Sequence, residues 1–365
     1  MQHDPKAASQ ERAILVQVVT RGPDFESAGE SLAELERLAD TAGVRVTGSI
    51  VQRRGRPTPG FFVGEGKLAD IKMACQRTNA NLIIVDNELS PVQVNNIDIA
   101  TGIKVIDRTE LILQIFARRA RSAESQIQVE LAQLQYLVSR IPVSEKQQRF
   151  KGGVGMKGPG ESPFQLRSEP MRRRIRDLKA KLETIGQRRE RTRSRRQWPL
   201  VSLTGYTNAG KSTLLNALTS AGAYVDDRLF ATLDTKTRLV RLGGGEDMLL
   251  TDTVGFIRNL PHGLVASFRS TLEEIAESNL LLILAEASHP CVSDHVDIVM
   301  KTLREIGAEK VPSILLLNKF DRCDAAMSAS LLRTFPAAMP VSALNGTGLP
   351  EVKEAIARCL KAQHG

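Results

Sequence analysis

Short apolar runs and longer amphipathic stretches alternate along the first third of the chain. The run Ala13–Thr20 predicts a buried strand, and Phe25–Ala42 predicts a helix with its leucines on one face. Further strands are predicted at Val44–Gln52, Leu82–Asp86 and Ile103–Asp107, with a helix from Gly64 to about Thr78. Strands that alternate with helices predict a small parallel α/β sheet in this part of the chain.

The middle of the chain carries two apolar seams with the spacing of packed helices. No glycine or proline occurs between Thr109 and Ile141. Apolar residues recur there at intervals of four and three, and the rhythm returns after Pro170. The two seams are Ile127, Leu131, Leu134, Val138 and Ile141, and Met171, Ile175, Leu178, Leu182 and Ile185. Because Lys151–Pro170 is too rich in glycine for a helix, we expect an antiparallel helical hairpin with a flexible, basic tip.

A glycine-rich segment follows the next apolar run. Val201–Thr204 predicts a strand, Gly205 opens the pattern G-x-x-x-x-G-K-S, and Leu214–Leu218 continues as a helix. This strand–loop–helix order is the context of a phosphate-binding P-loop, although an accidental glycine turn before a helix is the alternative. The residues expected to contact the nucleotide are Gly205, Tyr206, Thr207, Asn208, Ala209, Gly210, Lys211, Ser212 and Thr213. Lys211 is expected to reach the β and γ phosphates.

Two downstream segments predict a magnesium site and a catalytic centre. Asp226–Arg241 is polar and irregular, and Thr232 within it is placed as a switch residue. The strand Met248–Leu250 leads into Asp252, Thr253, Val254 and Gly255, which are expected to contact the nucleotide. We expect Ser212, Thr232 and Asp252 to hold Mg2+, and Lys211, Thr232 and Gly255 to act in catalysis.

The last two motifs select the base. The strand Ser313–Leu317 follows the strand Leu280–Ala285 and ends in Asn318-Lys319-Phe320-Asp321. A carboxylate at Asp321 accepts hydrogen bonds from N1–H and the 2-amino group of guanine, and adenine has neither donor. The segment Ser342-Ala343-Leu344 follows the last strand and is expected to supply a backbone N–H for the guanine 6-oxo group. These motifs, in this order and at strand ends, predict a GTPase that converts GTP and water to GDP and phosphate.

Composition adds a charge signal. The hydrophobic fraction of 42% and the charged fraction of 25% are ordinary for a globular protein, while the net charge of +9 is concentrated in the middle of the chain. Basic residues crowd Arg118–Arg121, Lys146–Lys157 and Arg172–Arg196, which favours a polyanionic partner. The four cysteines are far apart, and no apolar leader or membrane-length run occurs. We therefore expect a cytoplasmic protein with no membrane span.

Two glycine-containing segments leave alternatives open. Gly64-Glu65-Gly66-Lys67 lacks a long glycine loop and a hydroxyl residue after the lysine, which favours a helix start over a second phosphate site. The glycines of Lys151–Glu161 have two interpretations. Either they only make the loop flexible, or they let the backbone come close to a phosphate-rich surface, where Lys151 and Lys157 would supply positive charge.

From residue 13 onward the chain resembles the HflX family of translational GTPases, in the Obg–HflX branch. The resemblance rests on Asp107-Arg108-Thr109, Gln128–Ala132, Gly158-Pro159-Gly160-Glu161, Asp252–Phe256 and Leu260-Pro261-His262. It implies GTP hydrolysis with Mg2+, binding to the large (50S) ribosomal subunit and its rRNA, and splitting of stalled ribosomes under stress. It also implies an ATP-dependent activity on RNA for the N-terminal part. We expect a mostly monomeric protein.

The sequence departs from the family pattern at three places. Ser162-Pro163-Phe164 intervenes before Gln165, the usual Val-Asp-Ala-Ser reads Ala285-Glu286-Ala287-Ser288, and the usual Leu-Asp-Pro-Thr-Thr-Arg appears as Leu233–Arg238. Glu286 keeps the charge with a longer reach, whereas the last change is expected to loosen the switch.

We therefore expect an α/β protein in three parts. Residues 1–110 are predicted to form a small N-terminal α/β domain, and residues 111–197 a long antiparallel helical hairpin with a glycine-rich loop. Residues 198–365 are predicted to form a Ras-like P-loop G domain with a mostly parallel sheet. Two rival functions remain: a nucleotide-gated RNA or ribosome binder with incidental hydrolysis, and an ATP-driven RNA remodeller.

Overall fold

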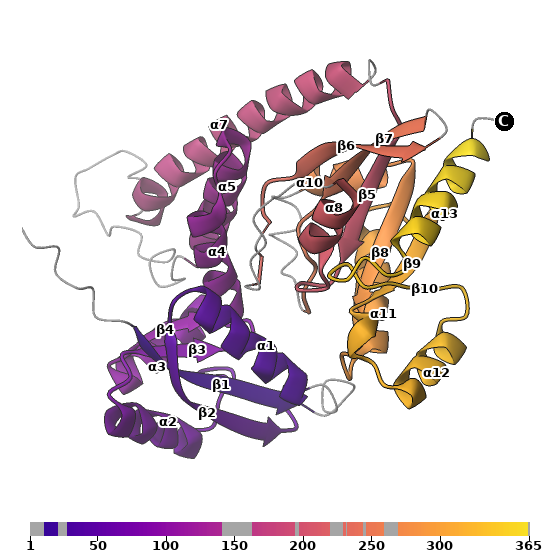
Figure 1. Ribbon diagram of the computed structural model, residues 1–365. Coiled ribbons are helices and arrows are strands. Elements are labelled where there is room, and N and C mark those ends of the chain that lie inside the picture. The colour runs from indigo at the N-terminus through magenta and orange to yellow at the C-terminus, as the bar shows by residue number, and fades with distance from the viewer. Residues whose placement is uncertain are drawn as a thin grey trace, which may run out of the picture. The chain divides into compact units, whose positions relative to one another are not determined.

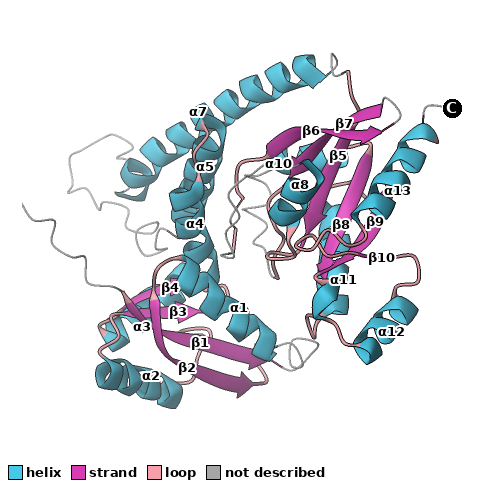
Figure 2. Ribbon diagram, viewed as in Figure 1, coloured by secondary structure: helices cyan, strands magenta, loops and turns pink. Residues whose placement is uncertain are grey.

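The computed structural model describes residues 11–20, 28–140, 163–193, 197–219, 229–230, 232–243, 246–258 and 269–363, so the N-terminal ten residues lie outside it. The chain divides into two compact units, residues 1–118 with 130–179 and residues 119–129 with 180–365. Each unit is built on its own sheet flanked by helices, which is an α/β architecture (Figures 1 and 2). The three-part division at residues 110 and 197 stays a prediction.

The first unit contains a four-stranded parallel sheet. Its strands lie in the order β2 (Arg45–Arg54), β1 (Arg12–Thr20), β3 (Leu82–Val85) and β4 (Lys104–Asp107). β1 and β3 are buried along most of their length because helices cover the sheet, whereas β2 at the edge alternates between exposed and half-buried positions. Alternate apolar side chains of β1 and β3, with Val105 of β4, form one core with the helical residues Leu68, Ile71 and Ile97.

Four helices connect and follow these strands: α1 (Ala28–Thr41), α2 (Glu65–Thr78), α3 (Pro91–Thr101) and α4 (Arg108–Arg119). The start of α2 at Glu65 confirms the interpretation of Gly64–Lys67 as a helix start. The pattern of apolar residues missed α3, whose apolar side chains do not gather on one face. Its signals lie at the ends, where Ser90 and Gln93 form a capping box, Pro91 opens the helix and Gly102 closes it with φ 71°.

Two long helices, α5 (Ala123–Ser139) and α7 (Pro163–Arg193), follow α4. The stretch that lacks glycine and proline nevertheless breaks between α4 and α5, where Ser122 caps the new helix by accepting a hydrogen bond from the Ser125 N–H. The loop predicted to extend to Pro170 is wrong at its end, because α7 already begins at Pro163 and includes Pro170. Pro163 suits a first helical turn, where no N–H is needed. Residues 141–162, with the glycine-rich segment, lie outside the described residues.

The apolar seam of α7 is visible in its burial. Leu178 is fully buried, and Met171, Ile175, Leu182 and Ile185 are half-buried among exposed neighbours. Two ion pairs connect α7 to α5: Arg174 lies 2.6 Å from Glu130, and Arg189 lies 2.8 Å from Glu124. The Arg174 pair lies within the first unit and the Arg189 pair within the second, and the antiparallel hairpin stays a prediction.

The second unit contains a six-stranded sheet with one antiparallel edge strand. The order is β10 (Met339–Pro340), β9 (Ser313–Asn318), β8 (Leu280–Glu286), β5 (Leu200–Gly205), β7 (Glu246–Asp252) and β6 (Lys236–Gly243). Only β6 runs antiparallel to its neighbour. The helices are α8 (Lys211–Thr219), α10 (Arg269–Ala276), α11 (Val292–Glu305), α12 (Ala325–Thr334) and α13 (Leu349–Lys361). Because β5, β7 and β8 are central, the loops after them meet at one edge of the sheet.

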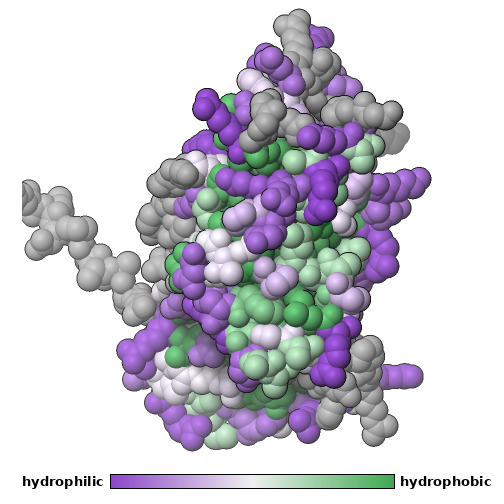
Figure 3. Space-filling model, turned by 45° about the vertical axis from the view of Figure 1, so that its right-hand side comes forward, coloured by the Kyte–Doolittle hydropathy of each residue, from purple (hydrophilic) through white to green (hydrophobic). Residues whose placement is uncertain are grey.

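The surface mixes residue types. Hydrophilic and hydrophobic residues both reach it on the face drawn in Figure 3, and the most exposed large apolar side chains include Ile99 and Leu344. Among the helices that the structure describes, none has the length and apolar character needed to cross a membrane.

Candidate nucleotide-binding site

A tight loop joins β5 to α8 at the centre of the second sheet. Gly205 and Gly210 have φ values of 151° and 93°, which L side chains rarely adopt, and Asn208 also has a positive φ of 61°. A Cβ atom at Gly205 would lie 2.3 Å from the Leu284 carbonyl oxygen, and one at Gly210 would lie 2.2 Å from Asn318 Nδ2. The loop therefore requires glycine at both positions, as the P-loop pattern predicts.

Lys211 begins α8 and turns its side chain back into this loop. Its Nζ donates hydrogen bonds to the carbonyl oxygens of Tyr206 at 2.8 Å and Gly205 at 3.2 Å. Burial lowers the pKa of Lys211 to about 8, and the charge of Asp252 acts in the opposite direction. Among the described residues, the hydrogen-bond partners of this buried ammonium group are carbonyl oxygens, and such a group is suited to receive phosphate oxygens. The Gly255 backbone lies beside it, since a Cβ atom there would be 2.9 Å from Lys211 Nζ.

Ser212, Thr232 and Asp252, the three residues expected to hold Mg2+, converge on one point. Asp252 Oδ2 accepts hydrogen bonds from Ser212 Oγ at 2.6 Å and Thr232 Oγ1 at 2.9 Å, and the two hydroxyl oxygens lie 3.0 Å apart. Asp252 is fully buried, and within the described residues its Oδ1 atom has no hydrogen-bond partner. A buried carboxylate oxygen without a partner, beside two hydroxyl oxygens, fits the hard oxygen ligands that Mg2+ prefers. The residues present therefore fit a magnesium ion.

The loop after β7 is pinned to the P-loop through its backbone. The Thr207 N–H donates to the Phe256 carbonyl at 2.8 Å, and the Phe256 N–H donates to the Gly205 carbonyl at 3.1 Å. Thr253 is fully buried and donates from Oγ1 to the Leu203 carbonyl at 2.7 Å, and Val254 next to it is half-buried. The Asp252–Gly255 segment thus lies against the P-loop.

Asn318 at the end of β9 joins the remaining motifs to the P-loop. Its Nδ2 donates to the Ala209 carbonyl at 2.7 Å, and its Oδ1 accepts from the Ala343 N–H at 3.0 Å. The Ala343 N–H is therefore directed at Asn318 in this structure. Lys319 has a positive φ of 60° and forms an ion pair with Glu286 at 2.9 Å, so the longer Glu286 side chain does reach this loop.

A hollow of about 280 Å³ opens beside these residues. Its lining contains Asn208, Gly210, Thr213, Asn318, Lys319, Asp321, Arg322, Ser342, Ala343 and Leu344. All but Arg322 were expected from the sequence to contact the nucleotide. Asp321 is exposed and lines this hollow, which suits a base-selecting carboxylate.

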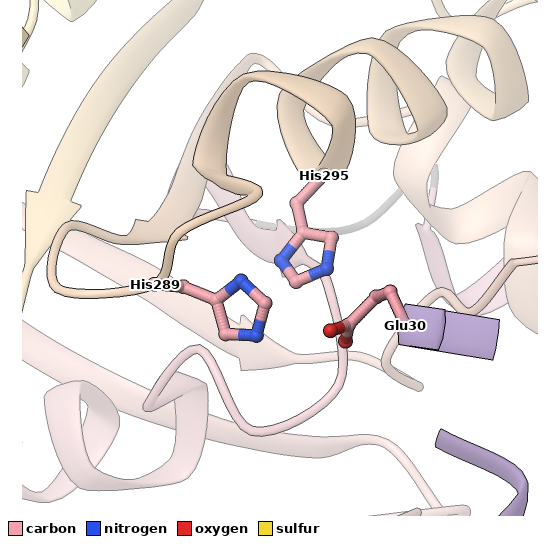
Figure 4. A group of neighbouring side chains, drawn as sticks. All are labelled: Glu30, His289 and His295. Carbon is pink, nitrogen blue, oxygen red and sulfur yellow. The ribbon is translucent and has the colours of Figure 1, made fainter. Parts of the chain in front are cut away.

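Sequence patterns gave no indication of a ring stack behind the P-loop. The Tyr206 ring lies parallel to the His295 ring with 3.8 Å between centroids, and the Tyr206 hydroxyl accepts a hydrogen bond from the Arg258 N–H at 2.9 Å. The His289 ring is tilted by 34° against His295 at 4.3 Å, as Figure 4 shows for the two imidazoles. His295 comes from α11, so no local window could connect it with Tyr206.

Comparisons with known proteins agree with these motifs. Family models described as GTP-binding GTPase N-terminal, GTP-binding GTPase Middle Region and 50S ribosome-binding GTPase match residues 29–117, 119–196 and 200–319. The protein GTPase HflX of Caldanaerobacter subterraneus subsp. tengcongensis is 44% identical over 356 residues, which cover 96% of this chain and 81% of that protein. GTPase HflX of Escherichia coli K12 is 40% identical over 369 residues, which cover 97% and 84%.

Similarity to solved structures also extends over nearly the whole chain. The crystal structure of SsGBP in complex with GDP has a TM-score of 0.53 and 25% sequence identity, and the similarity covers 96% of this chain and 98% of that one.

Proposed function

The chain belongs to the HflX family of GTPases, and from this premise we propose that it uses GTP hydrolysis to act on the large ribosomal subunit and to split stalled or idle ribosomes under stress. The family supports GTP hydrolysis directly. The observation that carries the mechanism is the convergence of Ser212 and Thr232 on the buried Asp252 carboxylate, beside Lys211. The setting we propose is cytoplasmic, with a mostly monomeric protein.

In this proposal the P-loop and its neighbours position the γ-phosphate. N–H groups of residues 205–213 and the positive end of the α8 dipole surround the phosphates, and Lys211 exchanges its carbonyl partners for phosphate oxygens. Ser212, Thr232 and Asp252 would hold Mg2+, which neutralises charge on the β and γ oxygens when bound. The Gly255 N–H would bind the γ-phosphate next to Lys211. Charge that develops in the transition state then meets groups already in place.

Base selection follows from the hollow beside Asn318. Asp321 would accept two hydrogen bonds from guanine, and the loop of Ser342, Ala343 and Leu344 would contact the 6-oxo group. Asn318 ties this loop to the P-loop through both ends of its amide, so base and phosphate sites are held at a fixed spacing. That rigidity supports discrimination between bases.

Two features support a ribosomal partner. The family model matching residues 200–319 is described as a 50S ribosome-binding GTPase. Helix α7 presents exposed arginines at 172, 173 and 176, and basic residues outnumber acidic ones along its length. Such a basic surface suits the phosphate backbone of rRNA.

The glycine-rich segment Lys151–Glu161 belongs to this proposal although it lies outside the described residues. Its composition supports contact with rRNA. Deleting it should abolish binding to the large subunit while GTP binding by the free protein stays intact, and neutralising Lys151 and Lys157 should flatten the salt dependence of subunit binding. If the deletion variant still binds 50S particles with wild-type affinity, the segment acts only as a spacer.

The experiment that tests the ribosomal role is co-sedimentation with 50S, 30S and 70S particles. It should be run with GDP and with a non-hydrolysable GTP analogue. Preferential pelleting with 50S particles in the analogue, and loss of 70S particles to free subunits, support the proposal. Equal binding in both nucleotides with no loss of 70S particles would favour a binder with incidental hydrolysis.

A further inference from the structure

Asp234 lies two positions after Thr232 and contacts the segment that begins α5. Its Oδ1 accepts a hydrogen bond from Ser122 Oγ at 2.6 Å, and its Oδ2 accepts from the N–H groups of Arg121 at 3.1 Å and Ser122 at 3.3 Å. These residues all belong to the second unit. A carboxylate at the first turn of a helix is also favoured by the helix dipole.

The segment 232–234 is thus held from two sides. At one end the Thr232 hydroxyl donates to Asp252, and at the other Asp234 binds Arg121 and Ser122. Leu233 between them is buried with only 3% of its surface exposed. Because two residues of chain span about 7 Å at most, a displacement of Asp234 must be felt at Thr232.

The Ser122 hydroxyl also makes a hydrogen bond to the helix that it precedes. Its Oγ accepts a hydrogen bond from the Ser125 N–H at 3.1 Å, which caps the start of α5. One hydroxyl therefore serves the helix as acceptor and Asp234 as donor. Loss of that hydroxyl frees the carboxylate from its shortest contact.

We propose that Asp234 is a positioning residue for GTP hydrolysis, which holds Thr232 at the metal site by anchoring it to the start of α5 through Ser122. This inference rests on the proposed role of Thr232 in holding Mg2+. It gives a role to a residue that was not among those expected to contact the nucleotide or Mg2+. It also makes the first turn of α5 sensitive to whether Thr232 contacts the metal site. A GTP state, in which the switch segment contacts Mg2+ and the γ-phosphate, would strengthen both contacts together.

The test uses the full chain with Ser122→Ala, Asp234→Ala and the double variant. Affinity for a non-hydrolysable GTP analogue and for GDP should be measured over a range of Mg2+ concentrations. Each single change should weaken analogue binding about tenfold, as expected for lost hydrogen bonds to a charged group, and raise the Mg2+ concentration needed. GDP affinity should change little. The double variant should be no weaker than Asp234→Ala, because that variant has already lost the contact with the Ser122 hydroxyl.

Two further variants separate positioning from general damage. Ser122→Thr keeps the hydroxyl and should restore analogue binding. Ser90→Ala removes the equivalent cap of α3 in the other unit and should leave the ratio of analogue to GDP affinity unchanged. If Asp234→Ala does not fold, Ser122→Ala changes one exposed hydroxyl and still decides the question.

Additive losses in the double variant, or an unchanged Mg2+ requirement in Asp234→Ala, would overturn the inference. The binding measurement needs neither ribosomes nor turnover. It therefore gives an answer for Asp234 even if the ribosomal role proposed above is wrong.

Discussion

Phe256 pairs with Tyr206 in a single parallel bridge, and both side chains belong to one buried cluster of the second unit. Phe256 is 1% exposed. The position directly after Gly255 therefore supplies a core residue rather than a group that faces the γ-phosphate. In Ras a glutamine orients the attacking water, and this chain has no such group at this position.

The first prediction follows from that burial. Phe256→Gln should not accelerate GTP hydrolysis, because the new amide would lie in the core. It should lower the free energy of unfolding by about 3 kcal/mol or more, from lost packing and a buried polar group. Urea unfolding and single-turnover hydrolysis measure the two effects. Phe256→Leu, which stays apolar, should cost less stability, and faster hydrolysis by the glutamine variant would refute this assignment.

The second prediction concerns the metal site. Asp252→Asn keeps the shape of the side chain but removes the charge that is proposed to hold Mg2+. Single-turnover GTP hydrolysis should fall by at least about 100-fold and lose most of its response to Mg2+. Asp247→Asn changes an aspartate on the same strand away from the cluster and should behave as wild type. A Mg2+ response in Asp252→Asn equal to that of the wild type would place the ion elsewhere.

The third prediction concerns the base. Asp321→Asn should shift preference from GTP toward xanthosine triphosphate, because a lost bidentate match leaves polar groups unpaired and costs on the order of 10⁴ in discrimination. Competition binding with GTP, ATP and xanthosine triphosphate measures it. Asp324→Asn, which alters the nearby N-cap of α12, is the matched control. An unchanged GTP affinity in Asp321→Asn would contradict the assignment of Asp321 as the base-selecting residue.

The sequence predicted those parts of the site in which motifs follow the ends of parallel strands. Ser212 and Asp252 are forty residues apart, yet β5 and β7 are parallel neighbours, so their carboxyl ends meet and the two oxygens lie 2.6 Å apart. Sequence spacing together with the rule for parallel sheets is enough to predict this meeting.

Other features depend on tertiary contacts that no local pattern encodes. The side chain of Phe256 faces the core because Tyr206 and α11 lie there, and His295 reaches Tyr206 from a distant helix. The Ser122 contact with Asp234 joins residues 112 positions apart. By contrast, the signals for α3 at Ser90, Pro91 and Gly102 were present in the sequence, but its lack of an apolar face concealed them.

A fourth prediction concerns pH and the first unit. Burial raises the pKa of Glu110 and the charge of Asp107 raises it further, while Lys104, Arg140 and a hydrogen bond from Tyr136 act in the opposite direction. A raised pKa in the folded state means that the folded protein binds more protons than the unfolded one in the window above the ordinary pKa. Stability therefore falls as pH rises through that window.

Glu110→Gln should accordingly raise the free energy of unfolding at pH 7 and change it little at pH 4, where the wild-type carboxyl is largely protonated. Urea unfolding at both pH values measures the difference. Glu88→Gln alters an exposed carboxylate of the same unit and should have no such effect. A stabilisation of equal size at both pH values would contradict the electrostatic explanation.

The central claim is that the nucleotide site hydrolyses GTP slowly until a ribosomal particle completes it. Single-turnover hydrolysis by the full chain should be measured with and without 50S subunits, beside Lys211→Ala as the inactive control. We predict a rate below about 10⁻² s⁻¹ for the free protein, because the residue directly after Gly255 is the buried, apolar Phe256, which cannot orient water. We also predict a clear acceleration by 50S subunits that the control lacks. Fast hydrolysis by the free protein, or no acceleration by any ribosomal particle, would contradict this account.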